Sequence, residues 1–475
     1  MKRLLLLAVL VMPTWAAADP LVSPYLYLNR CSGGCTVRSG FDDARTMSSS
    51  IPCSGTVTCG GGGCSCDGGG AATFTIEEFR DSAGNIGAAA DPEWNAIVQC
   101  VREVYSPYNV MVVDQLPPGG LSHNQGIIAG RPANIGYGGA GVGGIAPGSL
   151  GCNPQDNVIS FTFANIYSGS NRVLSICAVA AQETAHAYGL DHAYEWADHT
   201  SACTDPMTYR TDCGGQKFFR NANAICGEFG PRTCKCGGFQ NSHLKLESIF
   251  GAATPITRPP SVAVMAPTDG AQVSNGAIVT ATASAQRGIA RMDLWLNNYK
   301  WATVKGAPFG PSGQLESQYS LPFPADVPDG VIDIVVKAYD DIEVEADSTQ
   351  ITVTKGAPCT SASTCADGQK CEQGRCFWDA PTGELGDACT YPQFCVSGHC
   401  VETTDGDQFC SQECIVGVAD SCPMGYTCDG PAVSNGFCVS EDAKKPCTDC
   451  SSGGDGRLLL VLVLGVGLLL RRRRR

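Results

Sequence analysis

Positive charge is scarce in this 475-residue chain, which has 32 lysine and arginine residues against 46 aspartate and glutamate residues. The formal net charge is −14, and because a nucleic-acid-binding face needs basic residues to neutralise phosphates, this balance argues against a nucleic-acid partner. Charged residues of both signs make up 16% of the chain, whereas hydrophobic residues make up 43%. Most of the sequence can therefore bury a core and is not a solvated, disordered chain.

Cysteine is absent from one long stretch, between Cys236 and Cys359, although the chain has 28 cysteines. Fourteen of them precede this gap and fourteen follow it, the last being Cys450. A cytosolic protein of this composition would need several metal clusters, whereas an exported protein needs only disulfides. The cysteine content therefore favours an oxidising compartment, and the gap marks a domain that folds by burial alone.

A long apolar run is also missing, because neither end reaches the roughly 20 residues that a membrane-spanning helix normally uses. At the N-terminus, two basic residues precede a short apolar core, Leu4–Met12, and small residues that end at Ala18. This order predicts a secretory signal peptide cleaved after Ala18, in agreement with the cysteine content. A buried N-terminal helix is the alternative.

At the C-terminus, thirteen apolar or glycine residues, Leu458–Leu470, lie between Arg457 and five terminal arginines. Such a helix is about 20 Å long, short of the roughly 30 Å hydrocarbon core, although snorkelling arginines could let it span. The order of cysteine, polar spacer, apolar segment and arginine cluster resembles the tails of surface proteins handled by myxosortase-type proteases in some Gram-negative bacteria. The resemblance implies a sorting protease as partner and processing at Cys450; a plain transmembrane anchor is the alternative.

Removal of both ends would take away eight basic residues and one acidic residue, so the formal charge would fall from −14 to about −21. Such a surface suits an exposed, soluble protein and could hold calcium, which binds carboxylate oxygens. We therefore expect an exported protein at the cell surface, in the outer membrane or outside the cell. The cell envelope or an extracellular surface is then an expected partner.

Composition shifts divide the chain into a multidomain protein. The expected parts are a signal peptide (1–18), a Gly/Cys-rich N-terminal segment (19–70), an α+β domain (71–252), an all-β domain (257–355), a disulfide-rich small module (359–438) and the sorting or transmembrane tail (447–475). Within the α+β domain, apolar spacing predicts a helix over Asp91–Val104 with Asp91 as N-cap, and a second helix over Val173–Tyr188 closed by Gly189. Strands are predicted over Tyr108–Val113 and Val158–Phe163.

The cysteine-free stretch carries short apolar runs at sandwich-like intervals, namely Val262–Met265, Ile278–Thr282, Met292–Leu296 and Val331–Tyr339. Two motifs, P-x-D-G-A-x-V from Pro267 and V-V-K-A-Y-D-D from Val335, resemble bacterial Ig-like modules. The resemblance implies an all-β sandwich. A role as spacer or stalk is preferred to a specific ligand site.

Twelve cysteines lie within residues 359–438 at near-regular spacing. A core this small cannot hold itself together by burial, so about six disulfides are expected. The motif C-x-x-G-x-x-C-x-x-G-x-C, from Cys365 to Cys376, resembles short cysteine-rich extracellular repeats. The pairing stays open, because spacing does not give connectivity.

The residues with the most chemistry form the run Q-E-T-A-H-A-Y-G-L-D-H, from Gln182 to His192. On a helix, residues 182, 183 and 186 share a face, so Gln182 and His186 can aim at one point while Glu183 reaches a bound water. Gly189 allows a sharp turn that brings His192 back to the same point. Two imidazoles and a third group leave one zinc position open for a water, whose pKa the metal lowers and whose proton Glu183 takes.

This run resembles the helix of the metzincin zinc peptidases, H-E-x-x-H-x-x-G-x-x-H, at Glu183, His186, Gly189 and His192. The resemblance implies that residues 71–252 form a metzincin-like catalytic domain, which hydrolyses protein or peptide substrates with Zn²⁺. It also implies that His186 and His192 are metal ligands and that Glu183 is the catalytic base.

A second motif, D-P-M-T-Y from Asp205 to Tyr209, looks like the Met-turn of the same family. The resemblance implies that Met207 forms an apolar floor beneath the metal. It also implies that the Tyr209 hydroxyl ligates zinc or stabilises the oxyanion.

The first histidine of the metzincin motif is replaced by Gln182, whose amide oxygen is a poorer zinc ligand than imidazole. Three outcomes are open: Gln182 ligates weakly, His199 or Tyr209 fills the position, or the domain is a catalytically inactive surface adhesin. We expect a secreted, surface-attached zinc endopeptidase, because an abandoned site has no need of Glu183.

Overall fold

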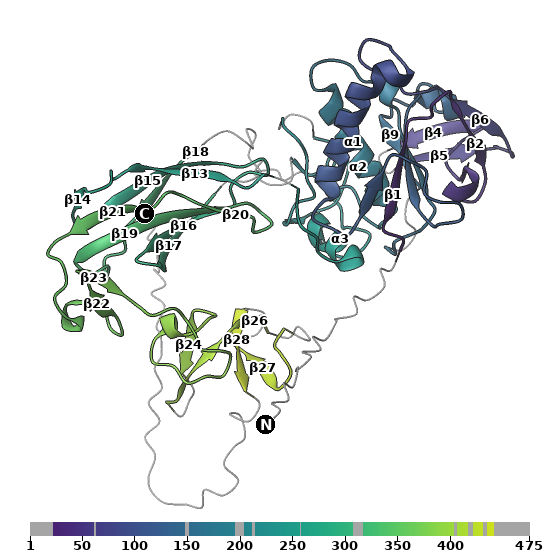
Figure 1. The fold of residues 1–475 in the computed structure, drawn as a ribbon. Coiled ribbons are helices and arrows are strands. Elements are labelled where there is room, and N and C mark those ends of the chain that lie inside the picture. Colours follow the sequence, from purple (N-terminus) through teal and green to yellow (C-terminus); the bar gives the residue numbers. More distant parts are fainter. Residues whose placement is uncertain are drawn as a thin grey trace, which may run out of the picture. The chain divides into compact units, whose positions relative to one another are not determined.

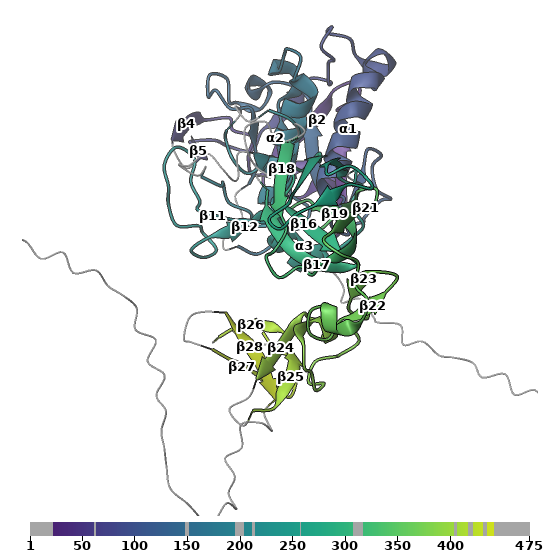
Figure 2. The same ribbon diagram turned by 90° about the vertical axis from the view of Figure 1, so that its left-hand side faces the viewer.

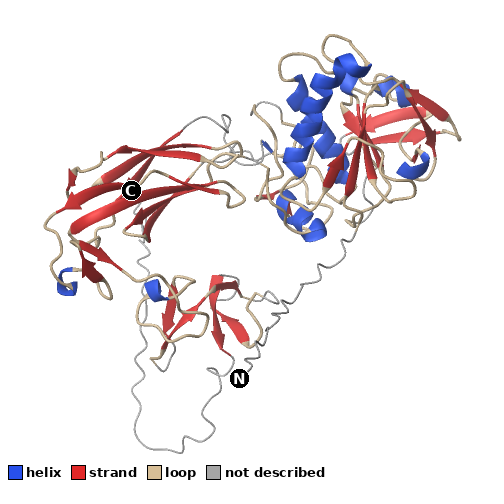
Figure 3. Cartoon of the chain, in the orientation of Figure 1, coloured by secondary structure: helices blue, strands red, loops and turns tan. Residues whose placement is uncertain are grey.

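The computed structural model describes residues 22–60, 63–147, 152–194, 204–210, 214–256, 258–306, 317–402, 406–416, 421–430 and 435–440. They fall into two compact units, Met1–Ala366 with Cys371–Phe377, and Asp367–Lys370 with Trp378–Arg475. The described part is a β-rich, multidomain protein whose α-helices all lie within residues 91–250, and the sandwich and the disulfide-rich region that follow are built mainly from strands (Figure 3). No helix within these ranges has the length and apolarity to cross a membrane, and the predicted processing positions Ala18 and Cys450 lie outside them.

A five-stranded sheet with the order β7-β1-β8-β10-β9 forms the centre of the N-terminal domain. Four strands run parallel, and β9 is antiparallel to β10 at one edge. The strands are β1 (Tyr25–Asn29), β7 (Met111–Val113), β8 (Asn124–Ile128), β9 (Gly144–Ile145) and β10 (Ile159–Thr162). Strand β10 lies within the range that its apolar alternation predicts, whereas β7 is shorter than predicted.

Strand β1 places the start of this domain earlier in the chain than residue 71. It lies between β7 and β8, and its Leu26 and Leu28 are completely buried. The Gly/Cys-rich segment therefore supplies an inner strand of the sheet and is not a separate N-terminal region. The rest of this segment, together with β6 (Thr73–Ile76) just after it, forms a small sheet and a hairpin pinned by disulfides. The strands within the segment are β2 (Cys35–Ser39), β3 (Ser48–Ser49), β4 (Thr56–Gly60) and β5 (Gly63–Asp67).

Two long helices, α1 (Asp91–Tyr105) and α2 (Arg172–His186), lie side by side against the sheet (Figure 1). Disulfide Cys100–Cys177 joins them, and α2 packs on β8 and β10. The prediction of Asp91 as N-cap is wrong, because the 3₁₀ turn Gly87–Ala90 runs directly into α1 and makes Asp91 the first helical residue. Its carboxylate instead pairs with Arg30.

Helix α2 ends where the chain must turn back towards the sheet. Gly189 has a φ of +85°, and a Cβ atom there would lie 2.6 Å from the carbonyl oxygen of Cys152. Glycine is therefore required both by the backbone conformation and by the close approach of a second segment. The elements that follow are β11 (Asn223–Ala224), β12 (Gln240–Asn241) and helix α3 (Ser242–Phe250), none of which is predicted from the sequence patterns.

Residues 258–355 form the predicted all-β sandwich. One sheet has the order β13-β15-β18, and the other has β14-β21-β19-β16-β17 with β20 paired to β19. Buried side chains of both sheets, among them Val279, Leu294 and Val336, share one core. The strands are β13 (Ser261–Ala266), β14 (Gln272–Val273), β15 (Ile278–Ser284), β16 (Arg291–Leu296), β17 (Tyr299–Lys305), β18 (Ser317–Pro322), β19 (Gly330–Tyr339), β20 (Glu345–Asp347) and β21 (Ile351–Lys355).

The twelve cysteines of residues 359–438 form six disulfides, as predicted. They repeat one interleaved pattern three times, the first cysteine of each four bonded to the third and the second to the fourth. The pairs are Cys359–Cys371 with Cys365–Cys376, Cys389–Cys400 with Cys395–Cys410, and Cys414–Cys428 with Cys422–Cys438. The short strands are β22 (Lys370–Glu372), β23 (Arg375–Phe377), β24 (His399–Glu402), β25 (Gln408–Ser411), β26 (Glu413–Ile415), β27 (Tyr426–Asp429) and β28 (Asn435–Ser440), of which Figure 2 shows the last five grouped together.

Candidate metal centre

Two histidines meet where α2 ends. His186 is the last residue of α2, and the turn at Gly189 returns the chain so that the His192 ring lies edge-on to the His186 ring at a centroid distance of 4.6 Å. Their Nε2 atoms are 3.0 Å apart. The structure therefore brings together the two imidazoles that the sequence motif nominates as ligands.

The other nitrogen of each ring has its own acceptor. Nδ1 of His186 lies 2.8 Å from the carbonyl oxygen of Leu190, and Nδ1 of His192 lies 2.9 Å from Oε1 of Glu228. Because a carbonyl and a carboxylate only accept, each Nδ1 must carry the proton, which leaves each neutral Nε2 with a bare lone pair. Two lone pairs facing each other at this distance repel unless a cation or proton lies between them, so the arrangement fits a metal ion.

Burial reinforces the neutral form of His186. Desolvation, with His192 adding to it, lowers the pKa of His186 to about 3. Burial also lowers the pKa of His192, although Glu228 acts in the opposite direction. Neutral imidazole is the form that binds transition metals, so both rings are prepared for coordination at neutral pH.

Gln182 and Glu183 lie one turn before His186 on α2. They are 6% and 7% exposed, and neither side chain hydrogen-bonds to another residue in the described ranges. Burial raises the pKa of Glu183 to about 8, a value suited to proton transfer near neutral pH. Gln182 offers an amide oxygen on the same helical face as His186, so a neutral third donor is available to a metal.

The edge strand β9 passes directly over Glu183. A Cβ atom at Gly144 would lie 2.6 Å from Cγ and 2.8 Å from Oε1 of Glu183. Glycine at this position therefore allows the strand edge and the carboxylate to be neighbours.

The segment Asp205–Tyr209, called the Met-turn below after the motif that it resembles, lies against the second histidine. Met207 is completely buried, and its carbonyl oxygen accepts a 2.9 Å hydrogen bond from the amide of Ala193, the residue after His192. The Tyr209 ring lies 4.6 Å from the His192 ring, and its hydroxyl pKa is raised to about 12 by burial and by Glu183 and Glu228. The turn thus contributes a buried methionine and a protonated, half-exposed phenol beside the histidine pair.

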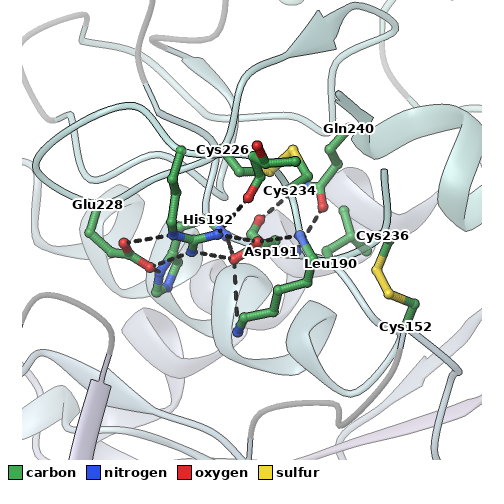
Figure 4. Close-up of polar contacts among 12 residues, drawn as sticks. Cys152, Leu190, Asp191, His192, Cys226, Glu228, Cys234, Cys236 and Gln240 are labelled. Atoms are coloured by element: carbon green, nitrogen blue, oxygen red, sulfur yellow. Dashed lines mark hydrogen bonds and ion pairs between the residues drawn. A yellow bond between two sulfur atoms is a disulfide. The ribbon is translucent and has the colours of Figure 1, made fainter. Parts of the chain in front are cut away.

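A network of charged side chains hydrogen-bonds to the Nδ1 atom and the amide of His192 (Figure 4). Arg232 donates 2.6 Å and 2.7 Å hydrogen bonds to the two oxygens of Asp191 and a 2.6 Å bond to Glu228, while the His192 amide donates to Asp191. Although burial opposes ionisation, Arg232 keeps the pKa of Asp191 at about 2. The network therefore stays ionised and fixes the orientation of the His192 ring.

Three members of this network, Glu228, Arg232 and Asp191, are not recognisable as functional residues from the sequence. Glu228 and Arg232 lie in the loop that disulfide Cys226–Cys234 closes. The amide of Gly227 donates to the carbonyl of His192 at 2.9 Å, and a bridge between Ala193 and Cys226 adds to it, so the loop lies against His192. The spacing of these cysteines is a signal for a pinned loop, but it does not say which residue the loop faces. His199, named as a substitute ligand, lies outside the described residues.

Four groups in the described ranges gather at least three side chains of metal-binding type. Three of them are cysteine triads, within residues 359–376, 389–410 and 414–438, whose sulfur atoms are joined in disulfides and are not free thiolates. The fourth is Asp191, His192 and Glu228. This fourth group shares His192 with the histidine pair, and its carboxylates are already hydrogen-bonded to Arg232 and to His192. The chemistry of these side chains does not select zinc over other divalent ions.

A family model described as "Bacterial Ig domain" matches residues 260–315. This match confirms that the chain contains an Ig-like module. The similar solved structures include fibronectin(III)-like modules of Clostridium thermocellum CbhA, at 12% identity and a TM-score of 0.16, covering 20% of this chain and 94% of that chain. Comparison with curated proteins gives no match.

Proposed function

We propose that the chain is an exported, surface-attached endopeptidase of the metzincin type that depends on zinc. The observation that carries the proposal is the 3.0 Å separation of the His186 and His192 Nε2 atoms, with both Nδ1 atoms bound to acceptors. The buried Met207 and the buried carboxylate of Glu183, one turn before His186 on α2, support the same function.

The metal would be held by His186 and His192, with the amide oxygen of Gln182 as a weak third ligand. When bound, zinc supplies Lewis-acid polarisation of the scissile carbonyl and of water. Glu228 keeps the Nδ1 proton on His192, so the Nε2 lone pair stays available. The Leu190 carbonyl does the same for His186.

Glu183 would take a proton from the attacking water and return it to the leaving amine nitrogen. Its raised pKa of about 8 makes both transfers accessible near neutral pH. The Tyr209 hydroxyl keeps its proton, since its pKa is raised to about 12, and can donate to the oxyanion that develops on the carbonyl.

The substrate would bind as an extended peptide along β9. This strand is at the edge of its sheet and pairs with β10 on one side only. An edge strand recognises peptide backbone by adding another strand, and Gly144 places that edge next to Glu183. Protein or peptide chains of many sequences could therefore be recognised through backbone hydrogen bonds.

A second candidate function, a non-catalytic surface adhesin, is favoured by one observation. Gln182 stands where a third imidazole would make a stronger zinc site. An adhesin would bind its partner through the same surface without needing a proton carrier, so the role of Glu183 separates the two functions.

The deciding experiment measures zinc content and hydrolysis of casein by the purified mature protein. We expect Glu183→Gln to retain zinc and to lower the hydrolysis rate at least about 100-fold, because general acid–base catalysis contributes factors of about 10² to 10⁴. His186→Ala should lose both zinc and activity. Glu77→Gln, on an exposed side chain, is the matched control.

Wild-type protein without zinc would leave the adhesin as the better assignment. The same conclusion follows if casein hydrolysis is indifferent to Glu183→Gln.

A further inference from the structure

The Ig-like module meets the N-terminal domain through a buried charge cluster. Arg220 and Arg287 are 2% and 1% exposed, and Asp341 is 7% exposed. Arg287 donates 2.7 Å and 2.8 Å hydrogen bonds to the two carboxylate oxygens of Asp341, and Arg220 donates to Oδ1 of Asp341 at 3.3 Å. Each arginine also reaches across to a carbonyl of the other domain, Arg220 to Arg287 at 2.7 Å and Arg287 to Phe219 at 2.9 Å.

The cluster continues from Arg220 into the Met-turn. Arg220 donates from Nε to Oγ1 of Thr204 at 3.0 Å and from its amide to Oδ2 of Asp205 at 2.9 Å. The other oxygen of Asp205 accepts the amide of Met207 at 2.8 Å. Since the Met207 carbonyl binds the amide of Ala193, the connection from Asp341 ends at the residue next to His192.

Buried charges shared between two domains are not expected in a module that acts only as a spacer. Two guanidinium groups are buried against the Asp341 carboxylate, with Asp205 and Asp340 also buried nearby, and a buried charge is tolerated only while its partners are present. Although burial raises the pKa of Asp341, Arg287 and Arg220 lower it below its usual range, so the carboxylate is ionised. A stalk needs only a covalent linker, whereas here each domain supplies a carbonyl acceptor to a buried arginine of the other.

We propose that the Ig-like module positions the Met-turn, with Arg287 and Asp341 acting through Arg220 on residues 204–207. The module is then a structural part of the candidate metal centre. The expected effect of the module on metal binding rests on the proposed function. Its expected effect on the conformation of the Met-turn does not.

The test compares full-length mature protein carrying Asp341→Asn with the wild type. The readouts are amide hydrogen exchange of residues 204–210 without metal, and Co²⁺ affinity measured by competition with a chromophoric chelator. We expect faster exchange in the Met-turn, with helix α1 unchanged, and about tenfold weaker Co²⁺ binding, as for loss of a supporting contact behind a ligand. Asp347→Asn, on a half-exposed acid of the same module, is the matched control.

A merely structural role would raise exchange throughout the domain and would not single out residues 204–210. If the Asp341→Asn variant does not fold, the same two measurements are made on Arg287→Lys. This variant keeps the positive charge but loses the bidentate contact with Asp341. Normal exchange in the Met-turn of a folded variant overturns the proposal. A wild type that binds no Co²⁺ counts against the proposed peptidase, while the exchange result still decides the role of the module.

Discussion

The Nε2 atoms of His186 and His192 face each other because the chain engages both Nδ1 atoms elsewhere. Leu190 and Glu228 each accept one Nδ1 proton, and the pKa of His186 is lowered to about 3 by burial and by His192. Since both histidines are already fixed, the affinity of the proposed site for a metal depends on its third donor. Gln182 occupies the helical position from which a third imidazole would join the pair.

Replacing Gln182 by histidine should strengthen metal binding. A third imidazole is a better zinc ligand than a neutral amide, so we expect Gln182→His to raise zinc affinity by on the order of tenfold, equivalent to about 1.4 kcal/mol. Isothermal titration with zinc measures the change. Gln99→His, at an exposed position of α1, controls for an added histidine. Unchanged affinity would show that residue 182 does not face the metal.

Residues within one helix and its turn were predictable from the sequence, and contacts between distant segments were not. Helical spacing and Gly189 predict that His186 and His192 converge, and the structure places their rings together. Glu228 escapes prediction because it follows His192 by 36 residues. Its position depends on a disulfide pairing that spacing alone does not give.

Among the secondary-structure elements, β9 and α2 together would define how closely the proposed peptide substrate approaches Glu183. The strand has two residues, Gly144 and Ile145, and it passes over the helix without a side chain at the first of them. Any side chain at residue 144 would displace either the strand edge or the carboxylate, because a Cβ atom there would lie within 3.0 Å of three atoms of α2.

Gly144→Ala should therefore reduce catalysis while leaving the metal in place. Overpacking costs about 1–3 kcal/mol, so we expect kcat/KM for a peptide substrate to fall by about tenfold or more. Zinc content, measured in the same preparation, should stay at the wild-type level, because the atoms nearest to a Cβ at residue 144 belong to Glu183 and Val179 and not to the proposed histidine ligands. Gly119→Ala, where a Cβ atom meets open space, is the control. Equal rates for both variants would contradict the placement of substrate along β9.

Helices α1 and α2 followed from apolar periodicity, whereas strand β1 did not follow from composition. The predicted apolar face of α1, including Trp94, Ile97 and Val101, is buried. Glycine and cysteine dominate residues 19–70 and indicate loops, but Leu26 and Leu28 alternate within that stretch as an inner strand requires. In residues 19–70, the local alternation of apolar residues indicates strand β1, whereas the average composition of the segment does not.

For the whole molecule, cysteine content predicts the division into disulfide-braced and cysteine-free parts. The Ig-like module is matched by a family model and has one core shared by two sheets. A role as stalk was the simpler expectation for it. The buried pairing of Asp341 with Arg220 and the backbone of Asn221 could not be predicted, because it joins residues more than 100 positions apart.

The two ends of the mature protein test the proposed route to the cell surface. We expect mass spectrometry of protein isolated from the producing cells to find Asp19 as the first residue and a C-terminus that lacks Leu458–Arg475. The physical reason is that the apolar segment is too short for a normal span and is flanked by a cysteine and an arginine cluster. A chain that retains Arg475 would indicate a plain transmembrane anchor.

The interleaved disulfides of residues 359–438 have a consequence for resistance to proteolysis. Between Cys359 and Cys376, between Cys389 and Cys410, and between Cys414 and Cys438, every peptide bond is bridged by at least one disulfide. A protease that cuts once inside any of these three spans leaves the pieces covalently joined. Within residues 359–438, only the short connections 377–388 and 411–413 can be severed by a single cut. The region therefore stays in one covalent piece after most single cuts by a protease.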